Sequence, residues 1–315
     1  MAKKSTSQIW IEYAPVRIIF GFFSLLPRST AIACGILLAK MVYPFLGGLR
    51  RTGLRNLEIA FPEKSNNERE RILKKSFQNL GRILGEFSQF FKVTPETLAE
   101  IVEYEFENEV NRNSDELKFY EAERAKGRGV ILASPHLGNW EIGVFAYSAL
   151  REPLKYLARP LDNPLIEDLT VRLRTRFGNQ PINKTNAVMS VIEILRNGDI
   201  LGVLPDVNVH PKEGVFVPFF NIPACTTSGV AMLALRTNAL IVPMFCVWDE
   251  AKKRYRVGYG KIIEPVRTGN RQQDIIETTA LYTAEIEKFI RANPEQWLWI
   301  HKRWKTRPPG EESLY

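Results

Sequence analysis

Cysteine and histidine are scarce in this chain, and their scarcity excludes several classes of protein. The three cysteines, Cys34, Cys225 and Cys246, lie far apart, so the sequence contains neither a disulfide scaffold nor a CxxC metal or redox motif. This pattern fits a reducing cytoplasmic compartment. The chain has only three histidines, and a multi-histidine metal centre would have to use nearly all of them. Internal repeats and low-complexity stretches are also lacking.

The composition is that of a folded protein with a basic surface. A length of 315 residues corresponds to two ordinary domains or one large α/β domain. With 45% hydrophobic and 25% charged residues, the chain is neither disordered nor a multi-span membrane protein. Its formal charge of +8 indicates an acidic partner. Nucleic acid, an anionic membrane and a phosphorylated substrate all satisfy that condition.

The N-terminus contains two apolar runs, at 14–26 and 29–46, and an arginine cluster follows the second one closely. The first run is shorter than the roughly 20 apolar residues of a membrane-spanning helix, and the second carries Lys40. We therefore expect residues 1–48 to form a helical hairpin that lies in a membrane interface, with the arginines near anionic headgroups.

Two alternatives to the interfacial hairpin stay open. One is a buried helix pair in a soluble core. The other is a secretory signal, because Ala31-Ile32-Ala33 resembles a cleavage site and Cys34 a lipidation site. Arg28 counts against the signal, since it falls between the apolar run and the supposed cut.

The rest of the chain predicts an α/β fold. We expect residues 49–126 to form a helical connecting region, continuous with an α/β core at 127–315. From Gly127 onward short apolar runs alternate with helical patterns, which favours a mostly parallel central sheet flanked by helices. The strands are expected at 130–133, 154–158, 200–204, 215–220, 240–247 and 255–263, and the main helices at 66–92, 139–150, 164–177, 187–196, 228–236 and 272–292.

Polar side chains follow three of the predicted strands. His136 comes after the first strand of the core, Arg159 after the second and Asp206 after the third. In open α/β sheets the ligand crevice lies outside the carboxyl ends of the strands. We therefore expect these three residues at one edge of the sheet.

The segment from Ser134 to Glu141 carries most of the chemical signal. Pro135 ends the strand, Gly138 permits a tight turn, and Asn139 is a suitable N-cap for the next helix. Glu141 then lies in the first helical turn, from which its carboxylate is expected to fold back toward His136. A histidine held by a carboxylate can remove a proton from an alcohol that attacks an acyl carbon.

This HxxxxE pattern is weak by itself, and a helix-start histidine satisfied by hydrogen bonds is the structural alternative. The sequence has no GxSxG nucleophile elbow. Direct transfer between two bound substrates therefore fits better than an acyl-enzyme mechanism.

Several blocks together resemble a known family. The segment from His136 to Glu141 resembles the HxxxxD/E motif of glycerolipid-type acyltransferases. The match is narrowed by the blocks 159–164 (RPLDNP), 217–220 (VPFF), 226–229 (TTSG) and 294–308 (PEQWLWIHKRWKTRP). With these blocks the chain resembles the late acyltransferases of lipid A biosynthesis over nearly its whole length.

The resemblance implies a bacterial enzyme on the cytoplasmic face of the inner membrane. It would move a fatty acyl chain from acyl carrier protein to a hydroxyl of an acylated Kdo–lipid A precursor, with no metal or organic cofactor. Its partners would be acyl carrier protein, the lipid precursor and an anionic membrane surface, and not nucleic acid. Another glycolipid or a lysophospholipid is the alternative acceptor, and a basic membrane-bound protein that binds lipid or nucleic acid without catalysis is the alternative of another class.

The resemblance also implies the site residues. His136 and Glu141 take the catalytic positions, and the substrate-binding positions fall on Arg159, Asp206, Asn139, Asn163 and Arg303. Arg159 would bind a substrate phosphate or pair with Glu141, against the simpler interpretation of a surface salt bridge. Asp206 would position a substrate hydroxyl, against the alternative of a turn cap.

The C-terminal block interleaves tryptophans with basic residues. Trp297, Trp299 and Trp304 alternate there with Lys302, Arg303, Lys305 and Arg307. We expect this block at a membrane interface or on a phosphorylated lipid, with burial of the tryptophans in the core as the alternative.

Overall fold

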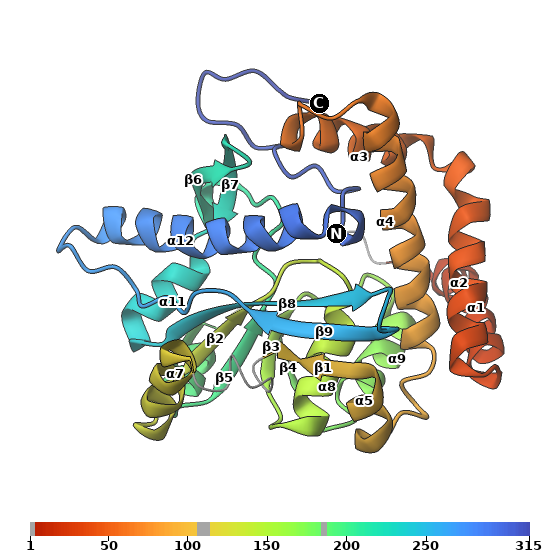
Figure 1. Cartoon of the computed structure of the whole chain (residues 1–315), viewed down its shortest axis with the longest axis horizontal. Coiled ribbons are helices and arrows are strands. Elements are labelled where there is room, and N and C mark those ends of the chain that lie inside the picture. Colours follow the sequence, from red (N-terminus) through yellow and green to blue (C-terminus); the bar gives the residue numbers. More distant parts are fainter. Residues whose placement is uncertain (1–3, 106–113, 184–187) are drawn as a thin grey trace.

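One seven-stranded sheet organises the chain. The computed structural model describes residues 4–105, 114–183 and 188–315 (Figure 1). The strand order is β1-β9-β8-β2-β5-β3-β4, and the only antiparallel pair in this described sheet is β8 with β9. The bounds of these strands are β1 Val102–Tyr104, β2 Val130–Ala133, β3 Lys155–Ala158, β4 Gln180–Asn183, β5 Ile200–Val203, β8 Leu240–Asp249 and β9 Arg254–Tyr259.

Helices cover both faces of this sheet. Alternate side chains of β2 enter opposite cores, Ile131 and Ala133 on one side and Val130 and Leu132 on the other. The first core is closed by α10 (Val188–Arg196), α11 (Gly229–Thr237) and α12 (Arg271–Ala292). The second is closed by α5 (Pro95–Ile101), α8 (Trp140–Leu150) and α9 (Pro164–Arg174), which lie below the sheet in Figure 1, opposite α12. Double coverage explains why β2 is apolar at every position.

The predicted fold class is confirmed, with three strands that are not among the six expected above. The strands at 130–133 and 200–203 and the antiparallel pair β8–β9 lie in the predicted positions. The predicted helix 187–196 corresponds to α10, although Ala187 lies outside the described residues. The additional strands are the short β1, within the region 49–126, the edge strand β4 with mainly exposed residues, and β7 (Ile222–Thr227), which pairs with β6 (Gly214–Phe219) in a separate hairpin.

The N-terminal region forms two consecutive helices, α1 (Thr6–Leu25) and α2 (Arg28–Val42). The main partner of α2 is not α1 but α4 (Asn66–Phe87). Glycines allow the two helices to approach closely. A Cβ atom on Gly85 would lie 2.7 Å from the carbonyl oxygen of Ala31, and a Cβ atom on Gly35 would lie even closer to the carbonyl oxygen of Gly81. The second apolar run is thus anchored on one side to α4.

Five further helical segments complete the described chain. They are the helices α3 (Gly47–Ala60) and α7 (Asp115–Ala125) and the 3₁₀ turns η1 (Tyr43–Phe45), η3 (Pro211–Glu213) and η4 (Pro294–Gln296). No single described helix is both long and apolar enough to cross a membrane. A pair of segments, Arg28–Phe45 and Gly47–Ala60, meets the length and composition requirement only as a unit bent by 94°.

The glycine contact between α2 and α4 gives a stability prediction. Replacing Gly81 with alanine puts a Cβ atom 2.7 Å from the carbonyl carbon of Gly35, so the helices must separate. We expect Gly81→Ala to lower the free energy of unfolding by about 1–3 kcal/mol in urea denaturation.

Gly21→Ala is the matched control. Gly21 lies inside α1, and a Cβ atom added to it would have no heavy atom within 4 Å. The greater helix propensity of alanine should therefore stabilise the protein by about 0.5–1 kcal/mol. If Gly81→Ala were as stabilising as Gly21→Ala, the close packing of α2 on α4 would be refuted.

Candidate active site

His136 lies on a short loop between β2 and α8, as the sequence predicts. The loop turns at Gly138, whose φ of +63° favours glycine. A side chain there would also collide with the backbone of Cys246 on β8. Asn139 is the N-cap of α8, and its Oδ1 accepts a hydrogen bond from the backbone N–H of Ile142 at 3.1 Å. The local sequence therefore fixes where the loop turns and where α8 begins.

The carboxylate that holds His136 belongs to Asp206, on the loop after β5. His136 Nδ1 lies 2.7 Å from Asp206 Oδ1, and the backbone N–H of His136 donates to Oδ2 at 2.8 Å. The indole Nε1–H of Trp297 donates to the same Oδ2 at 2.8 Å. Burial raises the pKa of Asp206, but His136 and Trp297 together hold it well below its usual value. Asp206 is therefore an ionised carboxylate inside the protein.

The expected contact between Glu141 and His136 is wrong. Both carboxylate oxygens of Glu141 bind Arg174 on α9, with Nε–Oε2 at 2.8 Å and Nη2–Oε1 at 2.6 Å. The physical reason is the strand order: β5 is the neighbour of β2, which places Asp206 beside His136, whereas the first turn of α8 faces α9. Glu141 still acts on His136 through its charge, which raises the pKa of the imidazole.

His136 is arranged to accept a proton at its outer nitrogen. Because Asp206 is ionised, Nδ1 carries the hydrogen that it donates, and Nε2 is left as the acceptor. Burial lowers the pKa of His136, but Asp206 and Glu141 more than offset this, and the pKa is raised above the ordinary 6.5. The His136 side chain is 20% exposed, and its ring lies edge-on to Trp140 at 5.1 Å between centroids.

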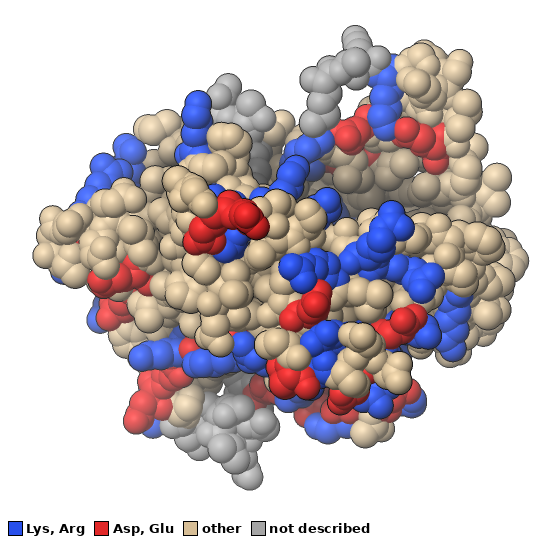
Figure 2. All heavy atoms as spheres, turned by 90° about the horizontal axis from the view of Figure 1, so that it is seen from above, with Lys and Arg blue, Asp and Glu red and all other residues tan. Residues whose placement is uncertain are grey.

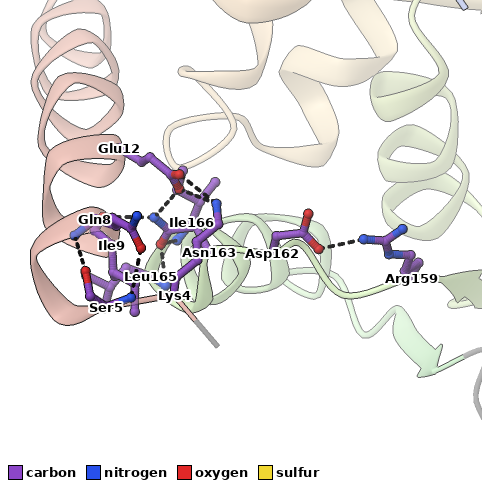
Figure 3. Close-up of polar contacts among 10 residues, drawn as sticks. All are labelled: Lys4, Ser5, Gln8, Ile9, Glu12, Arg159, Asp162, Asn163, Leu165 and Ile166. Atoms are coloured by element: carbon purple, nitrogen blue, oxygen red, sulfur yellow. Dashed lines mark hydrogen bonds and ion pairs between the residues drawn. The ribbon is translucent and has the colours of Figure 1, made fainter. Parts of the chain in front are cut away.

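Arg159 and Asn163 lie at the same edge of the sheet, but Arg159 is exposed and Asn163 is buried. The guanidinium of Arg159 is 60% exposed and pairs with Asp162 at 2.6 Å (Figure 3). The predicted alternative in which Arg159 pairs with Glu141 does not hold, because Arg174 binds both oxygens of that carboxylate. Asn163 is buried, caps α9, and donates to the Ile9 carbonyl and the Glu12 carboxylate of α1.

Asn139 and Arg303, like Asn163, make structural contacts, and their predicted role in substrate binding stays a prediction. Asn139 is fully buried and donates its Nδ2–H to the Tyr255 hydroxyl at 3.3 Å. Arg303 is also fully buried, and donates to the Cys225 carbonyl at 2.9 Å and to the Thr226 hydroxyl.

The tryptophans of the C-terminal block lie in the core, as in the alternative interpretation, while Lys302 and Lys305 between them are exposed. Trp297, Trp299 and Trp304 are at most 1% exposed and pack around Phe219 and Phe220. The sequence pattern does not predict this burial. Tryptophans that alternate with basic residues occur both at an amphipathic surface and in a loop whose aromatic side chains are buried in the core. The indole N–H of Trp297 instead donates a hydrogen bond to the carboxylate of Asp206.

Three residues of this site are not singled out by the sequence. Arg174 is one of three arginines on the same predicted helix, and only the fold shows which of them faces Glu141. Trp140 lies within the motif. His301 lies close enough to feel the charges of Asp206 and His136, and burial lowers its pKa to about 4. Among the described residues no group of three or more His, Cys, Asp or Glu side chains could hold a metal ion.

Comparison with known proteins finds relatives that match nearly the whole chain. A sequence model of the family described as bacterial lipid A biosynthesis acyltransferase matches residues 2–306. The lipid A biosynthesis lauroyltransferase of Escherichia coli (strain K12) is 29% identical over 311 residues, 97% of this chain and 95% of its own. The palmitoleoyltransferase of the same strain is 29% identical over 307 residues (97% and 94%), and the myristoyltransferase 26% over 266 residues (84% and 78%).

The pairing of His136 with Asp206 predicts a measurable shift in protonation. Asp206→Asn removes a buried negative charge beside the imidazole, so the pKa of His136 should fall. With only three histidines in the chain, the titration of each ring can be followed by NMR. We expect the pKa of His136 to lie above the ordinary 6.5 in the wild type and to be lower in Asp206→Asn than in the wild type.

The parallel variant Glu141→Gln separates the two carboxylates. It should shift the His136 pKa in the same direction but by less, since Glu141 acts only through its charge. A larger shift in Glu141→Gln than in Asp206→Asn would show that Glu141, and not Asp206, holds the imidazole.

Proposed function

The chain belongs to the bacterial lipid A biosynthesis acyltransferase family and is an acyltransferase, and we propose that it transfers a fatty acyl chain to a hydroxyl of an acylated Kdo–lipid A precursor. The single observation that carries the mechanism is the imidazole of His136, held through Nδ1 by a buried, ionised Asp206. We propose the acyl thioester of acyl carrier protein as the donor.

The proposed reaction is a direct transfer between two substrates. Nε2 of His136 takes the proton of the acceptor hydroxyl as its oxygen attacks the thioester carbon. Collapse of the tetrahedral intermediate breaks the carbon–sulfur bond, and the thiolate receives the proton from His136. The products are an ester and the free thiol of the carrier, and His136 returns to its neutral form.

The two carboxylates have separate roles in this proposal. Asp206 fixes the tautomer and orientation of the imidazole and stabilises the imidazolium. Glu141 supplies a second negative charge near His136, and Arg174 holds that charge in place through two hydrogen bonds. The chemistry assigned to these residues requires only the two substrates.

The charge of the surface supports acidic substrates and partners. Figure 2 shows lysine and arginine side chains spread over the face seen from above, with acidic side chains between them. The chain carries 43 Lys and Arg against 35 Asp and Glu. Arg159 is exposed at the carboxyl edge of the sheet, and its surface ion pair with Asp162 is of a kind that contributes little free energy. Arg159 is therefore the proposed contact for a phosphate of the lipid acceptor.

We also propose that the N-terminal helices hold the enzyme on the cytoplasmic face of the inner membrane. Large apolar side chains are exposed on α1 and α2 and at η1, in contrast to the close packing of α2 against α4. They are Trp10 (55%), Ile11 (72%), Ile18 (70%), Phe22 (56%), Leu25 (81%), Leu37 (56%), Met41 (56%), Val42 (38%) and Phe45 (85%). The cations Arg17, Lys40 and Arg51 accompany them in the sequence. Apolar side chains with adjacent cations are suited to an anionic bilayer surface.

The proposed function predicts the chemical composition of lipid A. Cells without the gene should make lipid A that lacks one acyl chain in mass spectra. The wild-type gene should restore that chain, and a His136→Ala gene expressed at the same level should not, since the variant has no base.

An unchanged lipid A mass in the deletion strain would reject lipid A as the acceptor. Purified protein that moves acyl chains from acyl carrier protein to a lysophospholipid, and not to the lipid A precursor, would point to the other acceptor class. Restoration by His136→Ala would refute the assigned base.

The membrane proposal predicts the effect of polar substitutions on α1. Ile18→Ser, Phe22→Ser and Leu25→Ser together remove three exposed apolar side chains without touching the α2–α4 contact. Each is expected to contribute roughly 1 kcal/mol or more of interfacial binding, so affinity for anionic vesicles should fall on the order of 100-fold in a flotation assay.

Val188, Met189 and Leu281 provide the matched control, because these exposed apolar residues lie on α10 and α12. Changing all three to serine should leave flotation unaltered. Equal loss of binding in the two triple variants would mean that α1 is not the membrane-binding surface.

A further inference from the structure

A buried ion pair connects the N-terminal helices to α4. Arg28, the first residue of α2, binds Glu86 with both ends of its guanidinium, Nε to Oε2 at 2.9 Å and Nη2 to Oε1. Glu86 has a side chain that is 1% exposed, whereas that of Arg28 is 30% exposed. The glycine contacts already hold α2 against α4, so packing does not require a buried charge here.

A tyrosine continues this polar chain toward the catalytic loop. Tyr255, on β9, is fully buried, and its hydroxyl accepts a hydrogen bond from Asn139 Nδ2 at 3.3 Å. The hydroxyl keeps its own proton for another acceptor, and it interacts electrostatically with the buried carboxylate of Glu86. Burial raises the pKa of Glu86, while Arg28 and the Tyr255 hydroxyl oppose that rise.

This series of polar contacts ends at Asn139, the N-cap residue that determines where the loop of His136 meets α8. Asn139 accepts from the Ile142 N–H through Oδ1, and its own backbone N–H donates to the Cys246 carbonyl at 2.9 Å. One residue earlier, the carbonyl of Gly138 accepts from Asn79 Nδ2 at 2.7 Å. Asn79 and Glu86 are seven residues apart, on the same face of α4. Helix α4 therefore holds the loop directly through Asn79 and indirectly through Glu86.

We propose that Glu86 and Tyr255 are positioning residues for His136, and that the chain Arg28–Glu86–Tyr255–Asn139 makes the geometry of the catalytic loop depend on the seating of α2. This inference rests on the proposed function, since it concerns the same histidine. Burying an ion pair is costly, and apolar residues of similar size often stabilise a fold as well or better. The role of this pair is therefore to define a position and not to add stability.

Tyr255→Phe tests this assignment with the smallest change. It removes one oxygen, the link between Glu86 and Asn139, and keeps the ring. In acyl transfer from acyl carrier protein to the lipid A precursor, we expect kcat to fall by about tenfold or more with KM within about twofold, because misplacing a catalytic group slows the chemical step and not binding.

Tyr282→Phe is the matched control. Tyr282 is also fully buried, and its hydroxyl donates to the Thr227 carbonyl at 2.8 Å. The variant therefore loses a comparable buried hydrogen bond that does not involve Glu86 or Asn139. We expect a similar decrease in melting temperature and unchanged kcat. Equal kcat values in Tyr255→Phe and Tyr282→Phe would overturn the proposal.

Arg28→Gln tests the other end of the chain. If the four residues act as a unit, Arg28→Gln should lower kcat as Tyr255→Phe does, and the double variant should be little worse than either single variant. The amides of residues 136–142 should exchange hydrogen faster in Arg28→Gln than in the wild type. Multiplicative losses in the double variant, or unchanged exchange in that loop, would contradict the coupling; if Arg28→Gln does not fold, the comparison of the two tyrosine variants decides.

These outcomes are distinct from a failure of the proposed function. A wild-type protein that transfers no acyl chain to the lipid A precursor rejects the function. A wild-type protein that does so, with kcat insensitive to Tyr255→Phe, rejects only the positioning chain.

Discussion

A buried carboxylate held by three N–H donors sets the geometry of the sheet edge that carries His136. Asp206 receives the imidazole and the backbone N–H of His136 and the indole N–H of Trp297. An ionised group in the interior is stable only when it is hydrogen-bonded and matched in charge, so each donor has to be in place. The loop after β2, the loop after β5 and the C-terminal block are thereby brought to one point. Trp297 is buried together with its donor group, which it presents to Asp206.

The sequence predicts the parts of this edge that depend on neighbouring residues. The strand, the turn at Gly138, the cap Asn139 and the start of α8 follow one another within a short segment, so local rules suffice. The partner of His136 cannot be predicted in the same way. The sequence places Asp206 at the correct edge, but its contact depends on β5 lying beside β2, which is a property of the sheet and not of any segment. The roles of Arg174 and Trp297 are not predictable for the same reason.

The N-terminal helices show a similar division between local pattern and tertiary context. Two apolar runs predict a membrane hairpin, and an apolar face is exposed on both helices. The same α2 also packs through glycines on α4 and binds Glu86 through Arg28. A hydropathy pattern identifies the apolar residues of a run, but it does not show which of them pack against the rest of the protein. We therefore infer that the outer face of these helices and their inner contacts serve different ends, one toward a bilayer and the other toward the loop of His136.

A structure with the lipid acceptor bound tests the arrangement of His136 beside the two carboxylates. We expect the acceptor hydroxyl within hydrogen-bond distance of His136 Nε2 while Nδ1 stays on Asp206. We also expect Glu141 to stay on Arg174. An imidazole turned so that Nδ1 leaves Asp206 and binds Glu141 would contradict this arrangement.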